Sequence, residues 1–174
     1  MTAIRLARPS DLSAVQEIAE AAYARYIERI GPRPAPMDDD YAARVADGAV
    51  HVACVAGAGE TGAGEADAGG SEAIVGFIVT AVHPDHLELS TVAVAPQQQG
   101  RGIGRQLIAC AEDLADRYGL QEVRLYTNEA IWENLELYPR LGYRETGRRN
   151  THGFDRVHFA KRVDSSGDTP RISN

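Results

Sequence analysis

An apolar strand, a glycine-rich turn and an amphipathic helix follow one another directly in this chain, and this succession constrains the fold most. The strand reads HLELSTVAVAP, and the turn reads QQQGRGIG, residues 97–104, with three alternating glycines. After it, Ile103, Leu107 and Ala111 recur at helical spacing. Ordering a glycine costs more conformational entropy than ordering any other residue. Three glycines between a strand and a helix therefore indicate a backbone that needs an unusual conformation or close approach to a ligand.

Hydrophobic periodicity assigns the remaining elements. We predict strands at residues 3–8, 49–56, 73–82, 86–96, 120–127, 143–147 and 154–163, and helices at 12–22, 23–30, 38–46, 102–118 and 131–142. These elements combine strands and helices, as in an α/β fold. A chain of 174 residues fits one domain, which we expect over residues 1–163. Residues 57–72 hold no branched aliphatic or aromatic side chain, so we expect a flexible loop there and a disordered polar tail at 164–174.

Composition excludes several classes of function. The net charge of −7 argues against nucleic-acid binding, which needs a basic face. Because no apolar stretch is long enough to span a bilayer and no signal peptide is recognisable, we expect no membrane association and a cytoplasmic location. Cys54 and Cys110 match no disulfide or metal framework, and His83 and His86 flank a turn, where such a pair is more often solvated. We therefore expect no metal.

The glycine-rich turn permits two interpretations. Glycines at a helix N-terminus let an anion approach the unpaired N–H groups, and Arg101 and Arg105 add positive charge at the same end. This pattern is typical of a phosphate site. Glycines in a tight strand-to-helix turn are equally often purely conformational, and the motif alone does not decide between the two.

The wider context resembles the GNAT superfamily of acyl-CoA-dependent N-acetyltransferases. Gln99, Gly102 and Gly104 match its Q/R-x-x-G-x-G/A signature, and ENLELYPRLGY resembles its late helix, which carries a tyrosine before a Gly-Phe/Tyr pair. The resemblance implies a seven-stranded mixed sheet, mostly antiparallel and splayed, with helices on both faces. It also implies that acetyl-CoA is the co-substrate and that an amine is the acceptor, and it allows a homodimer, which is common in the family.

The same resemblance implies where acetyl-CoA would lie. Its pyrophosphate would rest on the amides of the glycine-rich turn, and its pantetheine arm would pair with the backbone of the preceding strand, as an added strand does. The implied contacts are Val92, Ala93, Val94, Gln99, Gly100, Arg101, Gly102, Ile103, Gly104, Arg105 and Asn134. Asn134 departs from the family spacing, which would place an asparagine at the position of Ile131.

Two residues are candidates for proton transfer. Glu88 alternates with Leu87 and Leu89, so it points to the opposite side of its strand, where it is either a solvated side chain or the base that deprotonates the amine. Tyr138 precedes Gly142 by four residues, as in the family pattern, and a neutral phenol there can protonate the departing thiolate. A purely packed core tyrosine is the alternative.

The acceptor site is expected in the irregular region after the first helix. Tyr23, Tyr26 and Arg29 lie there and can hold an amine that also bears a carboxylate or an aromatic ring, although helix packing explains such residues as well. His152 falls in the predicted loop RRNTHGFD before the last strand and is a further candidate contact. A small-molecule amine is the expected acceptor. A protein N-terminus or lysine, and a non-catalytic acyl-CoA sensor, are the alternatives.

Overall fold

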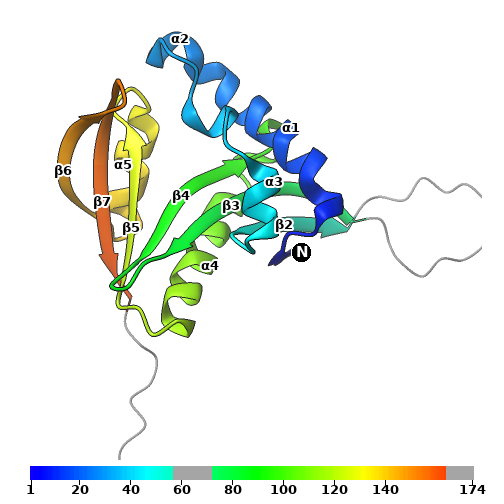
Figure 1. Ribbon diagram of the computed structural model, residues 1–174. Coiled ribbons are helices and arrows are strands. Elements are labelled where there is room, and N and C mark those ends of the chain that lie inside the picture. The colour runs from blue at the N-terminus through cyan, green and yellow to red at the C-terminus, as the bar shows by residue number, and fades with distance from the viewer. Residues whose placement is uncertain (57–71, 164–174) are drawn as a thin grey trace, which may run out of the picture. The chain divides into compact units, whose positions relative to one another are not determined.

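Seven strands form one mixed sheet in a computed structural model that describes residues 1–56 and 72–163 (Figure 1). The strands are β1 (Thr2–Leu6), β2 (Val50–Ala56), β3 (Glu72–Val82), β4 (Leu87–Val94), β5 (Glu122–Asn128), β6 (Arg144–Thr151) and β7 (Phe154–Arg162), in the order β1-β2-β3-β4-β5-β7-β6. β4 and β5 run parallel, whereas β1–β2, β2–β3, β5–β7 and β6–β7 are antiparallel. The predicted mixed, mostly antiparallel sheet is confirmed.

The helices follow the predicted order. They are α1 (Leu12–Tyr23), α2 (Ile27–Ile30), α3 (Tyr41–Ala46), α4 (Ile103–Arg117) and α5 (Trp132–Arg140). Within the described ranges, every helix is too short or too polar to cross a lipid bilayer. The predicted flexible loop lies outside the described residues except for Glu72, which begins β3, and the predicted tail lies outside them as well.

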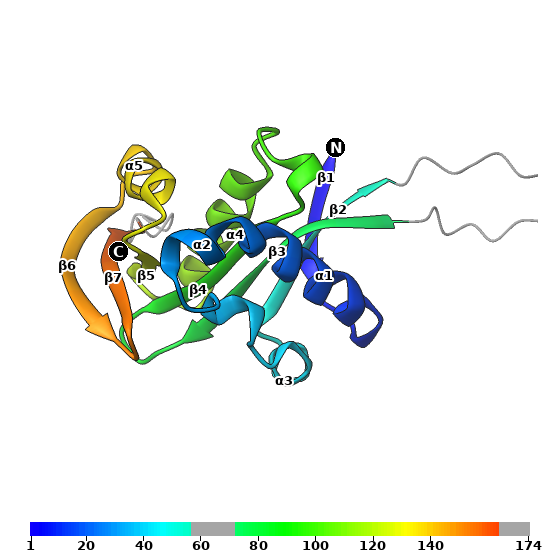
Figure 2. The ribbon, with the colours of Figure 1, turned by 90° about the horizontal axis from the view of Figure 1, so that it is seen from above.

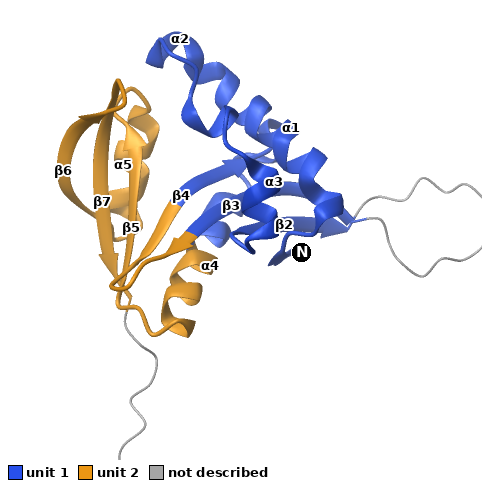
Figure 3. Ribbon diagram, in the orientation of Figure 1, with its two compact units in different colours: residues 1–80, 90–108 blue, residues 81–89, 109–174 orange. Residues whose placement is uncertain are grey.

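The chain divides into two compact units (Figure 3). Unit 1 comprises residues 1–80 and 90–108, and unit 2 comprises 81–89 and 109–174. β4 and α4 each contribute residues to both units. A single domain over residues 1–163 stays a prediction.

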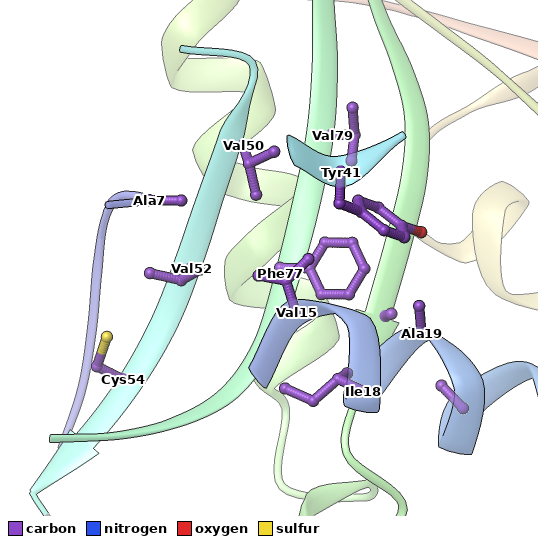
Figure 4. Packing of buried hydrophobic residues seen from close by; sticks show 12 residues of the cluster. Ala7, Val15, Ile18, Ala19, Tyr41, Val50, Val52, Cys54, Phe77 and Val79 are labelled. Atoms are coloured by element: carbon purple, nitrogen blue, oxygen red, sulfur yellow. The ribbon is translucent and has the colours of Figure 1, made fainter. Parts of the chain in front are cut away.

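The core of unit 1 lies between α1, α3 and the strands (Figure 4). Val15 of α1 and Val50 of β2 are fully buried there, and Phe77 of β3 meets the ring of Tyr41 edge-on at 5.3 Å. On the other face of β3, Leu107 of α4 lies beside Gly76, where an added Cβ would come within 2.8 Å of the Ala93 carbonyl oxygen. Helices therefore cover both faces of the strands of unit 1, as the resemblance implies.

Unit 2 contains β5, β7 and β6 with α5 on one side of them (Figure 2). Its core includes Val123 and Leu125 of β5 and Val157 and Phe159 of β7, all of them buried. Phe159 of β7 contacts the ring of Tyr138 of α5, so α5 covers the face of the strands on which Phe159 lies. β6 continues to Thr151, so the predicted loop RRNTHGFD is wrong apart from a two-residue turn. The cross-strand ladder between β6 and β7 extends the hairpin through these polar residues.

A buried ion pair fixes the start of α1. Asp11 is 7% exposed and accepts hydrogen bonds from Arg5 Nη1 at 2.7 Å, from Arg5 Nη2 at 3.2 Å and from the backbone N–H of Arg8 at 2.7 Å. The Asp11 carboxylate thus satisfies the backbone N–H of Arg8 just before this helix. Chiefly through the hydrogen bond from Arg5, these contacts lower the pKa of the Asp11 carboxyl.

We expect Asp11→Asn to destabilise the protein by about 1–3 kcal/mol, because Arg5 then loses its buried charged partner and keeps only the more exposed Glu72. A carboxyl with a lowered pKa stabilises the fold above the unfolded-state value of ~3.9, and this contribution disappears as the pH falls through the folded-state pKa. Urea unfolding of wild type and variant at neutral and acidic pH measures both effects. Asp38→Asn is the control, because Asp38 pairs with Arg33 on the surface, where an ion pair contributes little.

Candidate functional site

Two of the glycines in the turn between β4 and α4 are required by the backbone conformation. Gly100 and Gly102 have φ of +79° and +80°, in the left-handed region that side chains disfavour. Gln99 secures the turn by donating from Nε2 to the Val94 carbonyl at 3.1 Å, and Ile103 is buried just after it. The conformational interpretation is therefore confirmed for Gly100 and Gly102.

Gly104 is different. Its φ is not left-handed, and a Cβ built on it would meet only Val94 Cγ2, at an ordinary contact distance of 3.8 Å. Glycine in a helix costs about 1 kcal/mol relative to alanine. Neither backbone strain nor crowding in unit 1 accounts for a glycine at this position.

The charges at this helix start favour an anion. Arg101 and Arg105 are exposed and have no acidic partner among residues 1–56 and 72–163. The first turn of α4 holds no acidic side chain, and the helix dipole adds positive potential there. The two guanidinium groups therefore remain available to a phosphate or pyrophosphate.

In unit 1, β4 presents the strand segment that the resemblance assigns to pantetheine. Val92 and Val94 are half-buried, whereas the side chain of Ala93 is 3% exposed and packs in the core with α1, which leaves only its backbone for a ligand. Tyr23 donates its hydroxyl to the Val92 carbonyl at 3.1 Å. A carbonyl has two lone pairs, so Val92 keeps capacity for a second hydrogen bond.

Glu88 lies in unit 2, where β4 pairs with β5. It alternates with the buried Leu87 and Leu89, so the predicted side of the strand is confirmed. Its side chain is 33% exposed and Oε2 lies 3.7 Å from Nε2 of His83. The cross-strand neighbour of Glu88 on β5 is Arg124.

Tyr138 lies on the opposite face of these strands from Glu88. Its side chain is buried, and its ring packs at 5.5 Å from Phe159 and at 5.8 Å from Tyr143. Phe159 pairs with Leu125, which pairs in turn with Leu89, the neighbour that points away from Glu88. The structure thus assigns the two proposed proton-transfer groups to two faces.

A polar network supports the aromatic cluster around Tyr138. Tyr143 donates its hydroxyl to Glu112 Oε1 at 3.1 Å, and Lys161 donates to Glu112 Oε2 at 2.8 Å. Burial and the Glu112 carboxylate raise the pKa of Tyr143, so its phenol stays neutral. Asn134 donates to Thr127 Oγ1 at 3.0 Å and ties α5 to β5. Sequence analysis missed this network because its partners come from distant segments.

The predicted acceptor residues after α1 do gather. The rings of Tyr23 and Tyr26 meet edge-on at 6.3 Å, and the guanidinium of Arg29 lies 5.5 Å from the centre of the Tyr26 ring. Tyr26 is 7% exposed, so packing accounts for most of its surface. His152 instead occupies the β6–β7 turn in unit 2, with a left-handed φ of +54° beside Gly153.

Sequence analysis also missed a basic group of side chains on the Glu88 face of unit 2. Arg149 and Arg156 are cross-strand partners, and Arg156 lies 4.3 Å from the centre of the Tyr126 ring. Next to them, Nε2 of His158 is buried without a hydrogen-bond partner in the described part of the chain. Burial, followed by Arg149 and Arg156, lowers the pKa of His158, which favours the neutral imidazole.

The two cysteines are not part of this arrangement. Cys54 is buried and Cys110 is half-buried, and both are free thiols. Burial raises the pKa of each thiol, so neither is activated as a nucleophile.

Comparison with known proteins relates this geometry to one family. The family model described as "Acetyltransferase (GNAT) domain" matches residues 47–145, which include Glu88, the glycine-rich turn and Tyr138. Mycothiol acetyltransferase from Thermomonospora curvata is 43% identical over 72 residues, covering 40% of this chain and 24% of that protein. The match thus spans about a quarter of that relative.

Two solved structures show the same fold. Ard1 from Thermoplasma volcanium has a TM-score of 0.68 at 19% identity and covers 93% of this chain and 97% of its own. The Paia N-acetyltransferase from Thermoplasma acidophilum, solved in complex with coenzyme A, has a TM-score of 0.67 at 21% identity, with 93% and 99% of the two chains covered.

Proposed function

Because this chain belongs to the GNAT acetyltransferase family, we propose that it transfers the acetyl group of acetyl-CoA to the primary amine of a small molecule. The observation that carries the proposal is the turn before α4. There, neither backbone strain nor crowding requires a glycine at position 104, and Arg101 and Arg105, which have no acidic partner among residues 1–56 and 72–163, flank the helix start. These features fit the pyrophosphate of acetyl-CoA, and the relative solved with coenzyme A supports the same ligand class.

We assign the two proton transfers to two residues on opposite faces of the strands in unit 2. An alkylamine has a pKa of ~10, so only about one molecule in a thousand is neutral at pH 7. Glu88 is the base that removes the proton, directly or through water, because it is a half-exposed carboxylate at the strand position that the family resemblance implies. Tyr138 is the acid for the thiolate. The amine nitrogen and the sulfur are joined to the same carbon during the transfer, so a group on one face of the strands reaches its atom through water.

The basic side chains on the Glu88 face support an acceptor that carries a carboxylate as well as an amine. Like charges opposite each other on paired strands destabilise a sheet, and Arg149 and Arg156 are such a pair. Neither has an acidic partner within the described ranges. A carboxylate would relieve this repulsion and accept hydrogen bonds from both. Tyr23, Tyr26, Arg29 and His152 remain further proposed acceptor contacts, and Asn134 a proposed pantetheine contact.

The proposal is tested with purified protein, acetyl-CoA and a panel of amines, with free thiol release as the readout. Amino acids and their decarboxylated analogues form matched pairs, and we expect the amino acids to react faster. If a protein N-terminal peptide alone releases thiol, the acceptor class is wrong. If acetyl-CoA binds tightly and no amine releases thiol, the chain is an acyl-CoA sensor. A cytoplasmic location and a homodimer stay predictions.

We expect Gly104→Val to raise the dissociation constant for acetyl-CoA at least tenfold, about 1.4 kcal/mol, because a branched side chain covers the amides of the first turn. Calorimetric titration measures the constant, and a thermal melt checks the fold. Gly147→Val is the matched control, since Gly147 also has open space around it and no left-handed φ but lies on β6. An unchanged dissociation constant in folded Gly104→Val would remove the phosphate site.

We expect Tyr138→Phe to lower kcat by about 100-fold while KM for acetyl-CoA is kept, since the ring still packs against Phe159 and only the proton donor is lost. Tyr143→Phe removes a hydroxyl from the same aromatic cluster, but this hydroxyl bonds to Glu112. The control should therefore lose about 1 kcal/mol of stability and keep its kcat. Equal kcat values in the two variants would make Tyr138 a packing residue only.

A further inference from the structure

Three potential metal ligands meet at the β3–β4 turn of unit 2. One ligand atom each from His83, His86 and Glu88 lies within 4.8 Å of the other two, and the His83 Nε2 to Glu88 Oε2 distance is 3.7 Å. Tetrahedral zinc, with bonds of about 2.0–2.2 Å, needs ligand atoms roughly 3.3 Å apart. Side-chain shifts of about an ångström, with rotation of one imidazole out of its parallel stack with the other, bring the three ligand atoms to one point, and the side chains have room for this, since His83 is 42% and Glu88 33% exposed.

The β3–β4 turn brings the two imidazoles close together. The backbone N–H of His83 donates to the His86 carbonyl at 2.9 Å, which closes the turn between the strands. The two rings stack with an interplanar angle of 4° and centroids 4.5 Å apart. The side chain of His86 is 14% exposed, so it is less open to solvent than that of His83.

Around His86 there is an outer shell of the kind that orients metal-ligating histidines. Asp85 Oδ1 lies 2.7 Å from Nδ1 of His86, which leaves Nε2 of that ring for a ligand. Arg124 Nη2 holds the other oxygen of Asp85 at 3.0 Å, and its Nε bonds to Glu122. Two carboxylates therefore hold the Arg124 guanidinium at this turn, and neither of them is one of the three proposed ligands.

We propose that His83, His86 and Glu88 form a binding site for a divalent transition metal of the zinc class. Two imidazoles and one carboxylate suit such ions better than Mg²⁺ or Ca²⁺, and the fourth position stays open to water. Binding places a lone pair of Glu88 on the metal. Where Glu88 is the base of acetyl transfer, which rests on the proposed function, an occupied site inhibits the reaction reversibly.

Titration of the tag-free full chain with ZnCl₂, after treatment with a chelator, tests the site by calorimetry. We expect one equivalent to bind, and we expect His86→Gln and Glu88→Gln each to weaken binding at least 100-fold. Asp85→Asn should weaken it by about 10- to 100-fold through the outer shell. Glu122→Gln is the matched control, because it also removes a partner of Arg124 but touches no ligand, and its affinity should equal that of wild type.

Two results would overturn the site: wild type that binds no zinc, or His86→Gln and Glu88→Gln variants that bind it as wild type does. Thiol release measured with and without ZnCl₂, each variant relative to its own metal-free rate, tests the inhibition. We expect ZnCl₂ to lower the rate of thiol release by wild type and a chelator to restore it. We expect the rate of His83→Gln to be unaffected by ZnCl₂. Full activity at saturating zinc would overturn the inhibitory role, whereas a protein without any transferase activity would overturn the proposed function and leave the binding result standing.

Discussion

The left-handed backbone at Gly100 and Gly102 is the constraint on which the rest of this structure depends. It lets the chain leave β4 after Val94 and enter α4 at the buried Ile103 within a few residues. α4 then contributes Leu107 to unit 1 and Glu112 to unit 2. Side chains at the two glycines would cost about 1–2 kcal/mol each, and the same turn leaves backbone amides uncovered at a helix start. One backbone requirement thus produces both the connection and the helix start at which we propose that the pyrophosphate binds.

The register of β4 is the second constraint, because it decides what each face of unit 2 can do. Leu87 and Leu89 enter the core that α5 covers, and Glu88 is left on the other face. A shift of the β4 register by one residue would bury the Glu88 carboxylate and expose two leucines. Burying an unpaired charge costs too much free energy for that register to form. The apolar alternation of the strand therefore positions the proposed base, and it does so without any contact made for catalysis.

Periodicity and the glycine signature were enough to predict the order of elements, the sheet class and the side of β4 on which Glu88 lies. They failed where partners are distant in sequence. The Glu112 network joins α4, β7 and Tyr143, and the Arg149–Arg156 pair depends on the β6–β7 register, which no local pattern encodes. The loop predicted around His152 was wrong because RRNTHGFD lacks apolar alternation, whereas cross-strand pairing with β7 extends β6 through it.

Glu88 shows why a general base and a metal ligand are chemically close. Both roles need an ionised carboxylate with an accessible lone pair, and the partial exposure of this side chain provides it. His83, 3.7 Å away, can hold the carboxylate by a hydrogen bond or share a metal ion with it. Which of the two occurs depends on whether a proton or a metal ion lies between them. Because a proton and a metal compete for the same oxygen, a site that keeps Glu88 available as a base also keeps it available to zinc. The two histidines of the β3–β4 turn therefore lie beside the same carboxylate in either role that we propose for it.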